Sequence, residues 1–221
     1  MSLNIAIQFS GLPRWKKGIV QTQFSQMIIP AGARVDVFMG LWRVADFDYT
    51  EMPNETFEIF GSMALVNVLD DFNPPIPPQA TEMAGESKPI NIYKMHRAID
   101  FANELRTTSE KQTGRRYDVV IRTRPDLILS RSIDIGLYAE IARHCMVLPL
   151  NNNWRGGFND QFAIANPKDM NYYCAMYDKL NGYAMAGAWM HPERLLRRHL
   201  EEGGLSPVYG NFKSAICRIT S

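Results

Sequence analysis

The sequence predicts an α/β protein, built on an open, twisted, mostly parallel sheet flanked by helices, with some antiparallel strands late in the chain. Short apolar stretches with strand character alternate with stretches whose apolar residues recur at helical spacing. Prolines and glycines mark the turns between them. The 221 residues fit one domain, and no linker or internal repeat divides them, so we expect 1–221 to form a single domain.

The first 90 residues predict a strand, a helix, a strand and a second helix. Residues 4–9 alternate Ile and Phe with smaller or polar side chains, and residues 35–39 form another apolar stretch, both typical of strands. Apolar residues at helical spacing predict helices over 20–28 and around 57–64. Four closely spaced prolines predict an extended, mobile loop over about 72–90.

The clearest amphipathic stripe runs over residues 95–105 and predicts a helix, which Gly114 ends before a strand over 117–121. Residues 145–148 and 161–165 have the character of short strands.

Two further helices have recognisable starts. Asn166, Pro167 and Asp169 supply a capping residue, a first-turn proline and a first-turn acid. Pro192 opens a last helix, which ends at Gly203 before short C-terminal strands.

Composition excludes several classes of protein. A hydrophobic fraction of 46% and a charged fraction of 21% are ordinary globular values, so disorder and fibrous repeats are excluded. The longest uncharged stretch, Gly18 to Ala33, contains three glutamines and a proline, and we expect no transmembrane segment and no secretory signal. Three widely separated cysteines, Cys145, Cys174 and Cys217, favour buried thiols, a reducing compartment and a cytoplasmic location.

The net charge of +1 conceals an uneven distribution. Residues 44–87 contain nine Asp or Glu and no Lys, Arg or His, so the remainder carries +10. That excess suits a small ligand that carries phosphate, although the acidic stretch is equally explained as a solvated flank. No DNA or RNA motif occurs, and we expect no nucleic-acid partner.

The most informative segment is residues 117–127, where an apolar strand ends in alternating arginines and an aspartate. Because strand side chains alternate in direction, Arg122 and Arg124 project from one face at the carboxyl end of the strand. Ligands of open α/β sheets bind at this end, and a diphosphate would accept bidentate hydrogen bonds from both guanidinium groups. The alternative is that both arginines pair with carboxylates.

Two other segments supply candidate phosphate-binding groups. Ser10, Gly11 and Arg14 lie between the first strand and its helix, where they form either an ordinary turn or a cradle for a nucleotide. Lys94, His96 and Arg97 open the helix before the arginine strand and are candidates for the same phosphates. For Lys94 a solvated helix face is favoured.

Asp160 follows two glycines and precedes an apolar strand, which suits a carboxylate presented from a loop. We interpret it as a candidate general base. The alternative from the residues alone is that Asp160 caps a turn.

Five segments together resemble the glycosyltransferases of the GT-A type, particularly the WavE-like and related lipopolysaccharide, capsule and viral sugar-transfer proteins. They are residues 5–14, 35–42, 117–127, 159–163 and 192–196, in the family's order. The resemblance implies a GT-A-like fold and the transfer of sugar from a nucleotide-diphosphosugar donor to a carbohydrate acceptor. A catalytically silent nucleotide-sugar or carbohydrate-binding module of the same fold is the alternative.

Carried over residue by residue, the resemblance gives three groups of candidate site residues. The donor would contact Ser10, Gly11, Arg14, Arg97, Arg122, Arg124 and Asp126. The sugars would contact Gln161, His191 and Glu193. Asp160 would be the catalytic base, because a transfer that inverts configuration needs one carboxylate to deprotonate the acceptor hydroxyl. Alternatively, Asp160 would bind hydroxyls of the donor sugar.

The chain departs from the family in one place, because metal-dependent members carry Asp-x-Asp where this chain has Arg124-Pro125-Asp126. Either Asp126 alone anchors Mn²⁺ or Mg²⁺, or Arg124 itself supplies the positive charge.

Overall fold

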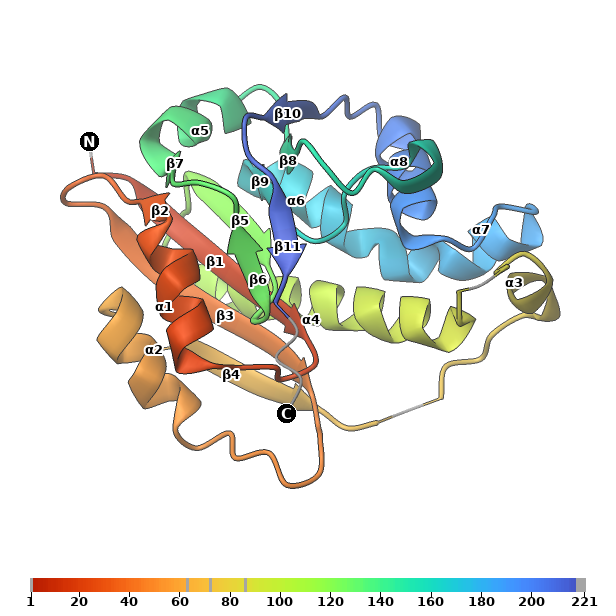
Figure 1. Cartoon of the computed structure of the whole chain (residues 1–221), viewed down its shortest axis with the longest axis horizontal. Coiled ribbons are helices and arrows are strands. Elements are labelled where there is room, and N and C mark those ends of the chain that lie inside the picture. The colour runs from red at the N-terminus through yellow and green to blue at the C-terminus, as the bar shows by residue number, and fades with distance from the viewer. Residues whose placement is uncertain (1, 63, 72, 86, 218–221) are drawn as a thin grey trace.

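The computed structural model describes residues 2–62, 64–71, 73–85 and 87–217. They form an α/β fold around a seven-stranded sheet of order β10-β8-β9-β5-β1-β3-β4 (Figure 1). The strands are β1 (Asn4–Gly11), β3 (Arg34–Trp42), β4 (Ala64–Leu69), β5 (Val119–Thr123), β8 (Val147–Pro149), β9 (Ala163–Ala165) and β10 (Val208–Gly210). Two small sheets pair β2 (Met27–Ile28) with β7 (Ile133–Asp134) and β6 (Leu127–Leu129) with β11 (Ser214–Ile216).

The predicted strand directions are confirmed. β1 is parallel to β3 and β5, β3 is parallel to β4, and β10 is parallel to β8. β9 is antiparallel to both of its neighbours, β5 and β8. The sheet is therefore mixed but mostly parallel, with its antiparallel strand late in the chain.

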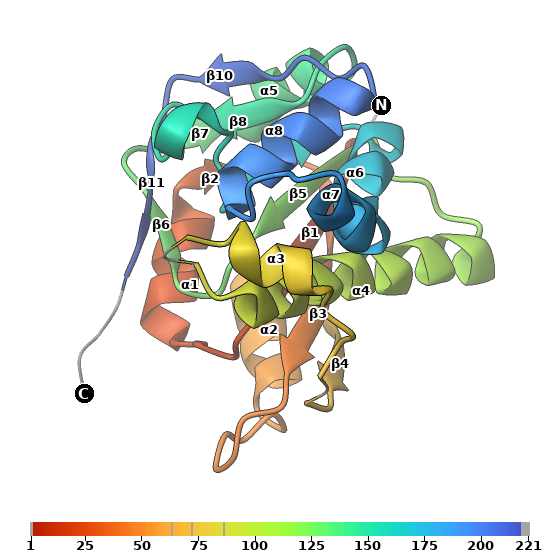
Figure 2. The same ribbon diagram turned by 90° about the vertical axis from the view of Figure 1, so that its right-hand side faces the viewer.

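Helices cover both faces of the sheet, as Figure 2 shows most clearly. One face packs against α1 (Lys17–Ser25), α2 (Met52–Phe60) and α5 (Ile135–Ala142). The other packs against α4 (Pro89–Thr113), α6 (Pro167–Cys174), α7 (Leu180–Met185) and α8 (Pro192–Glu202). The remaining helical segments are α3 (Pro78–Glu82) and the 3₁₀ turns η1 (Trp154–Gly156) and η2 (Ala175–Lys179).

Strand β1 lies in the middle of the sheet and is buried on both faces. Ile5, Ile7 and Phe9 pack with α1 and α2, whereas Ala6 belongs to the core under α4. Gln8 faces α4 as well, and its Nε2 donates to Asn103 Oδ1 at 3.0 Å. The predicted alternation in this strand is confirmed, and the layer between the sheet and α4 contains polar groups.

Two predicted helices end earlier in the structure than their apolar spacing indicates. Met27 and Ile28 leave the helix after its cap at Gln26 and pair with β7. Helix α2 ends at Phe60 because Gly61 adopts a left-handed φ of 66°, so Ala64 begins strand β4 instead of continuing a helix.

The segment predicted as an extended loop over 72–90 contains helix α3 and the start of α4. Pro78 and Pro89 each occupy the first turn of a helix, where the missing N–H costs nothing. Residues 72 and 86 of this segment lie outside the described residues.

The described cysteines are free thiols. Cys174 is fully buried, and burial raises its pKa to about 12, whereas Cys145 and Cys217 are half-buried. Within the described ranges, no helix combines the length and the apolar character that a membrane crossing requires.

The close approach of α4 to the sheet depends on a glycine in β3. A Cβ at Gly40 would lie 2.6 Å from the main-chain oxygen of Ala98 and 2.8 Å from the main-chain nitrogen of Ala102. We expect Gly40→Ala to lower the free energy of unfolding by about 1–3 kcal/mol, because backbone atoms of the helix must move. Urea denaturation measures this change.

Gly18 of α1 is the matched control, because it is exposed and a Cβ there meets nothing within 4 Å. Gly18→Ala should raise the free energy of unfolding by about 0.5–1 kcal/mol through helix propensity. Equal effects of the two substitutions would show that α4 does not pack as closely as described.

Candidate functional site

The topology of the sheet creates a crevice beside β1. From β1 the chain proceeds to β3 and β4 on one side, and then returns to β5 on the other. Open α/β sheets bind ligands at the carboxyl ends of strands where the order reverses in this way. A cavity of about 580 Å³ lies at this position, lined by residues that follow the ends of β1, β3 and β5.

The cavity wall is predominantly basic. The end of β1 and its loop contribute Ser10, Gly11 and Arg14, and the end of β5 contributes Arg122 and Arg124. The opposite wall comes from the end of β3, the segment after β4 and the start of α4, with Trp42, Arg43, Asp71, Asn91, Lys94 and Met95. The predicted meeting of the Ser10 loop with the arginine strand is therefore observed.

Arg122 is the most unusual side chain in this wall, because it is charged yet only 1% exposed. Its guanidinium donates to the main-chain oxygen of Asp160 and lies 3.5 Å from Ser10 Oγ. Its Nε is buried without a hydrogen-bond partner. Among the described residues, no carboxylate lies within ion-pair distance of it, so a buried positive charge faces the cavity uncompensated.

His96 of α4 lies in the same buried layer and is 0% exposed. Both ring nitrogens are buried without a hydrogen-bond partner. Burial, and next the charge of Arg122, lower the pKa of His96 to about 3, so the ring is neutral near pH 7.

The other two arginines at the ends of these strands are held by one carboxylate. Asp126 accepts from Arg124 Nε at 2.8 Å and Nη2 at 3.0 Å, and from Arg14 Nη1 at 3.2 Å. Burial opposes ionisation of Asp126, but the hydrogen bonds and charges of Arg124 and Arg14 outweigh it and lower its pKa. Asp126 is thus an ionised carboxylate that orients both guanidinium groups.

This arrangement does not fit a resident Mn²⁺ or Mg²⁺ at Asp126. Both of its oxygens already accept from guanidinium groups, and two fixed positive charges beside it oppose a third. Across the described ranges, no three His, Cys, Asp or Glu side chains are grouped so that they could hold a metal ion. We therefore derive no step through a metal.

Arg97 lies away from the cavity that the sequence predicted for it. Its guanidinium donates to Asp100 at 2.7 Å and to Glu104 at 3.0 Å, both on α4, and it stacks on Phe101 and Tyr177. Its partners explain the difference, because two carboxylates of α4 and the Tyr177 ring of η2 hold the guanidinium away from the cavity.

Lys94 lines the cavity and pairs with Asp71, although the sequence favoured a solvated helix face for it. Together with Arg43, which pairs with Asp70 at 2.6 Å, it extends the basic wall. The sequence analysis missed Arg43 and its neighbour Trp42. The same rule that singled out the end of β5 would have found them at the end of β3.

Asp160 does not line the cavity. Its side chain belongs to a second buried group with Glu193 and His191, in which His191 Nδ1 lies 2.8 Å from Glu193 Oε2 but is poorly aligned for a hydrogen bond. Burial, and next the charge of Asp160, raise the pKa of Glu193 to about 7. The main-chain oxygen of Asp160 connects this group to Arg122.

Gln161 has a structural role. Its Oε1 accepts from Asn152 Nδ2 at 3.2 Å and from Ser214 Oγ at 3.4 Å, which fixes the turn before β9 to the C-terminal segment. The sequence placed it with the sugar-contacting residues, but its amide oxygen is engaged in the fold.

In comparisons with known proteins, no protein-family model and no curated sequence matched the chain.

The neutral, buried state of His96 predicts a pH dependence of stability. Its pKa of about 3 in the folded protein lies below the value of about 6.5 expected in the unfolded chain, so the unfolded chain binds more protons below about pH 6.5. Acidification from about pH 7.5 to about pH 5 should therefore cost up to about 2 kcal/mol of unfolding free energy through this residue.

Urea denaturation of wild type and His96→Leu at both pH values tests this expectation, and the variant should lack this contribution. His144→Leu is the control, because His144 is exposed at the end of α5. The interpretation is wrong if His96→Leu and His144→Leu show the same pH dependence.

Proposed function

We propose that this protein is a glycosyltransferase that moves a sugar from a nucleotide-diphosphosugar donor to a carbohydrate acceptor. In this proposal the diphosphate of the donor occupies the basic cavity at the ends of β1 and β5 and contacts Arg122, Arg124 and Arg14. The carrying observation is the buried guanidinium of Arg122, which has no described carboxylate partner and borders that cavity.

An anionic ligand would offset the cost of burying this charge. Five Lys or Arg side chains line the cavity. Among the described residues, three carboxylates pair with them: Asp70, Asp71 and Asp126. The planar guanidinium fork matches phosphate oxygens in pairs, and Asp126 holds Arg14 and Arg124 ready for that contact. A compact polyanion such as a diphosphate is therefore the ligand class that the wall favours.

The resemblance to GT-A glycosyltransferases supports the same proposal. Two of the segments that carry it, 5–14 and 117–127, are far apart in the sequence, yet their Ser10, Arg14, Arg122 and Arg124 line one cavity. The antiparallel strand late in a mostly parallel sheet also agrees with the fold that the resemblance implies.

The proposed chemistry divides between two groups of side chains. Arg122, Arg124 and Arg14 would stabilise the negative charge that develops on the departing nucleoside diphosphate. Asp160, or Glu193 beside it, would accept the proton of the acceptor hydroxyl, and a carboxyl whose pKa is about 7 suits that task at neutral pH. The Asp160 main chain, bonded to Arg122, would couple the positions of the two groups.

A catalytically silent module that binds nucleotide sugars is the second candidate. The observation that favours it is the engagement of both Asp126 oxygens by arginines, which leaves the usual metal-binding position without a free acid. Binding of nucleotide sugar without any turnover would select this candidate.

Binding of nucleoside diphosphates is the first test. The melting temperature is measured with UDP, GDP, CDP and dTDP at millimolar concentration, each with and without Mn²⁺. We expect at least one of them to raise it, because binding stabilises the folded state. Arg122→Met should reduce the affinity by about 10–100-fold, since charged hydrogen bonds contribute about 1.5–3 kcal/mol. Without ligand, the variant should be as stable as wild type or more stable, because a buried charge is removed.

Arg143→Met provides the control, because Arg143 is an exposed residue that follows α5 and pairs with Glu140. It should leave the ligand-induced shift unchanged. If none of the four diphosphates moves the wild-type melting curve, donor binding at this cavity is refuted.

Turnover tests the proposed base. Release of nucleoside diphosphate from a panel of nucleotide sugars should fall at least about 100-fold in Asp160→Asn, as expected for loss of a general base. Affinity for the nucleotide should change little, because the Asp160 side chain does not line the donor cavity. Equal losses of turnover and nucleotide affinity would contradict this division of roles.

A further inference from the structure

The donor cavity continues into a groove along the start of α4. It shares Asn91 and Met95 with a neighbouring cavity of about 400 Å³, which extends to Pro192 at the start of α8. That cavity shares Ser87 with a third, of about 260 Å³, which is lined by His191 and Trp189. Figure 2 shows α3, the start of α4 and the start of α8 meeting on the side that faces the viewer. One continuous surface thus leads from the arginine strand to the loop before β9.

The far end of the groove carries a cluster of two arginines on one tryptophan, which we call the Arg155–Trp189–Arg194 cluster. The guanidinium carbon of Arg155 lies 4.6 Å from the Trp189 ring centroid, and that of Arg194 lies 5.1 Å from it. A guanidinium stacked on a ring keeps its N–H groups free at the edge for an anion. Burial, and next the charge of Arg155, lower the pKa of His191 beside the cluster.

These two arginines differ from their neighbours on α8. Arg197 pairs with Glu201 at 2.7 Å and Arg198 with Glu202 at 2.8 Å, so their charges are balanced within the helix. Among the described residues, no carboxylate pairs with Arg155 or Arg194. Arg155 and Trp189 line the far cavity and Arg194 lies over the same ring, so this end of the groove has two guanidinium groups without a described carboxylate partner.

The loop that carries Arg155 is fixed to α8 before any ligand binds. Phe158 N donates to the Glu193 main-chain oxygen at 2.9 Å, and Arg197 Nη1 donates to the Gly156 main-chain oxygen at 2.9 Å. Gly157 packs so closely on Glu193 that a Cβ would lie 2.3 Å from its carbonyl carbon. Arg155 itself adopts a left-handed backbone, with φ 51°, which an arginine adopts only when its surroundings impose it. The cluster is thus preorganised, which lowers the entropic cost of binding.

We propose that this groove binds the acceptor saccharide and that the Arg155–Trp189–Arg194 cluster binds an anionic substituent of that saccharide, a carboxylate or a phosphate. The assignment of the ligand as acceptor rests on the proposed glycosyltransferase function. The position of the cluster supports it, because the far cavity is also lined by His191, whose Nδ1 lies 2.8 Å from Glu193 Oε2 in the group that contains Asp160. A saccharide held by its charged group at one end would present a hydroxyl toward those residues.

Calorimetric titration with three saccharides tests the proposal. Tetragalacturonate supplies carboxylates, phosphopentamannose supplies a phosphate, and mannopentaose is neutral. At least one anionic saccharide should bind wild type at least about tenfold more tightly than mannopentaose, as a single charge-assisted contact provides. Which of the two binds distinguishes carboxylate from phosphate.

The double variant Arg155→Ala/Arg194→Ala should lose this preference, whereas Arg143→Ala, which removes a charge from another face, should keep it. The double variant should still bind the nucleoside diphosphate that wild type binds. Equal affinity of wild type for all three saccharides, or an undiminished preference in the double variant, would overturn the proposal. So would an oligonucleotide that binds to wild type as tightly as the best saccharide and is lost from the double variant.

Failure of this proposal is distinguishable from failure of the proposed function. Nucleotide binding that depends on Arg122, without any anionic preference, would retain the donor site and remove the acceptor site. An anionic preference without nucleotide binding would retain a saccharide-binding cluster and remove its role in sugar transfer.

Discussion

Arg122 carries a positive charge into the layer between the sheet, α4 and α6, where its side chain meets a main-chain oxygen and a hydroxyl but no described carboxylate. An interior charge of this kind costs several kcal/mol unless it is balanced. Two neighbouring groups accommodate this charge. His96 stays neutral beside it, and the Asp160 carbonyl turns toward it, which fixes the turn before β9. Arg122 is thus a buried charge at the border of a cavity, and the proposed donor site depends on this observation.

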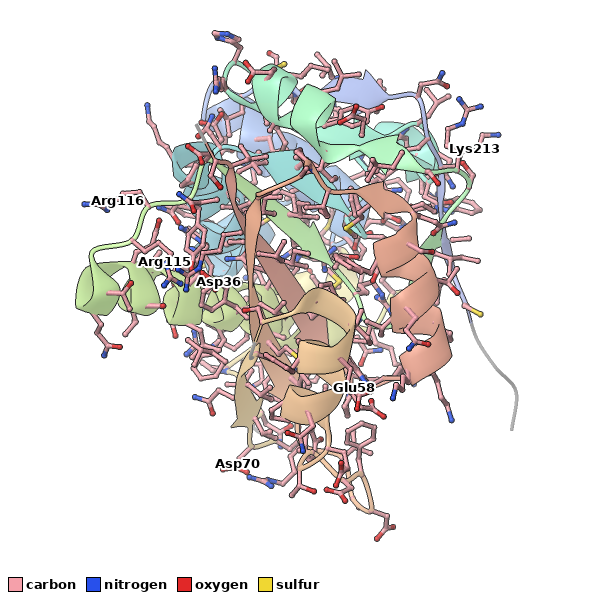
Figure 3. The ribbon with its side chains drawn as sticks, turned by 90° about the vertical axis from the view of Figure 1, so that its left-hand side faces the viewer. Asp36, Glu58, Asp70, Arg115, Arg116 and Lys213 are labelled. Atoms are coloured by element: carbon pink, nitrogen blue, oxygen red, sulfur yellow. The ribbon has the colours of Figure 1, made fainter. Side chains whose placement is uncertain are left out.

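Charged side chains are paired differently at the two ends of the sheet. At the amino end, Asp36 of β3 accepts from Arg115 and, at 2.9 Å, from Tyr117 Oη, and Figure 3 shows Asp36 and Arg115 close together. Asp36 also pairs with Arg34 at 3.7 Å, so both of its oxygens are engaged by neighbouring side chains. At the carboxyl end, Asp126 orients Arg14 and Arg124 toward open space, and Arg122 stays unbalanced. The amino end thus holds paired charges, whereas the cavity lies at the carboxyl end, where open α/β sheets bind their ligands.

Sequence-based prediction succeeded where one local rule dominates. The stripe in α4, its end at Gly114 with φ 69°, and the cap of α6 by Asn166 were all confirmed. It failed where pairing partners lie far away in the chain. Met27 and Ile28 continue the apolar spacing of α1, but hydrogen bonds to β7, more than 100 residues later, make them a strand. For Arg97, the sequence analysis identified a cationic side chain correctly but did not identify the side of α4 from which it projects.

The sequence by itself determined the α/β fold class, the alternation along β1, and the placement of two arginines at the end of a buried strand, because all three follow from spacing within one segment. The tertiary structure decided which charges remain unbalanced. Arg124, two residues from Asp126, donates to this carboxylate, but a further hydrogen bond comes from Arg14, more than 100 residues away in the chain. The sequence around Asp126 does not show that both arginines contact it. The groove likewise exists only because α3, α4 and α8 meet. Pairing of charges and the shape of cavities are properties of contacts between distant segments, and a single segment does not contain them.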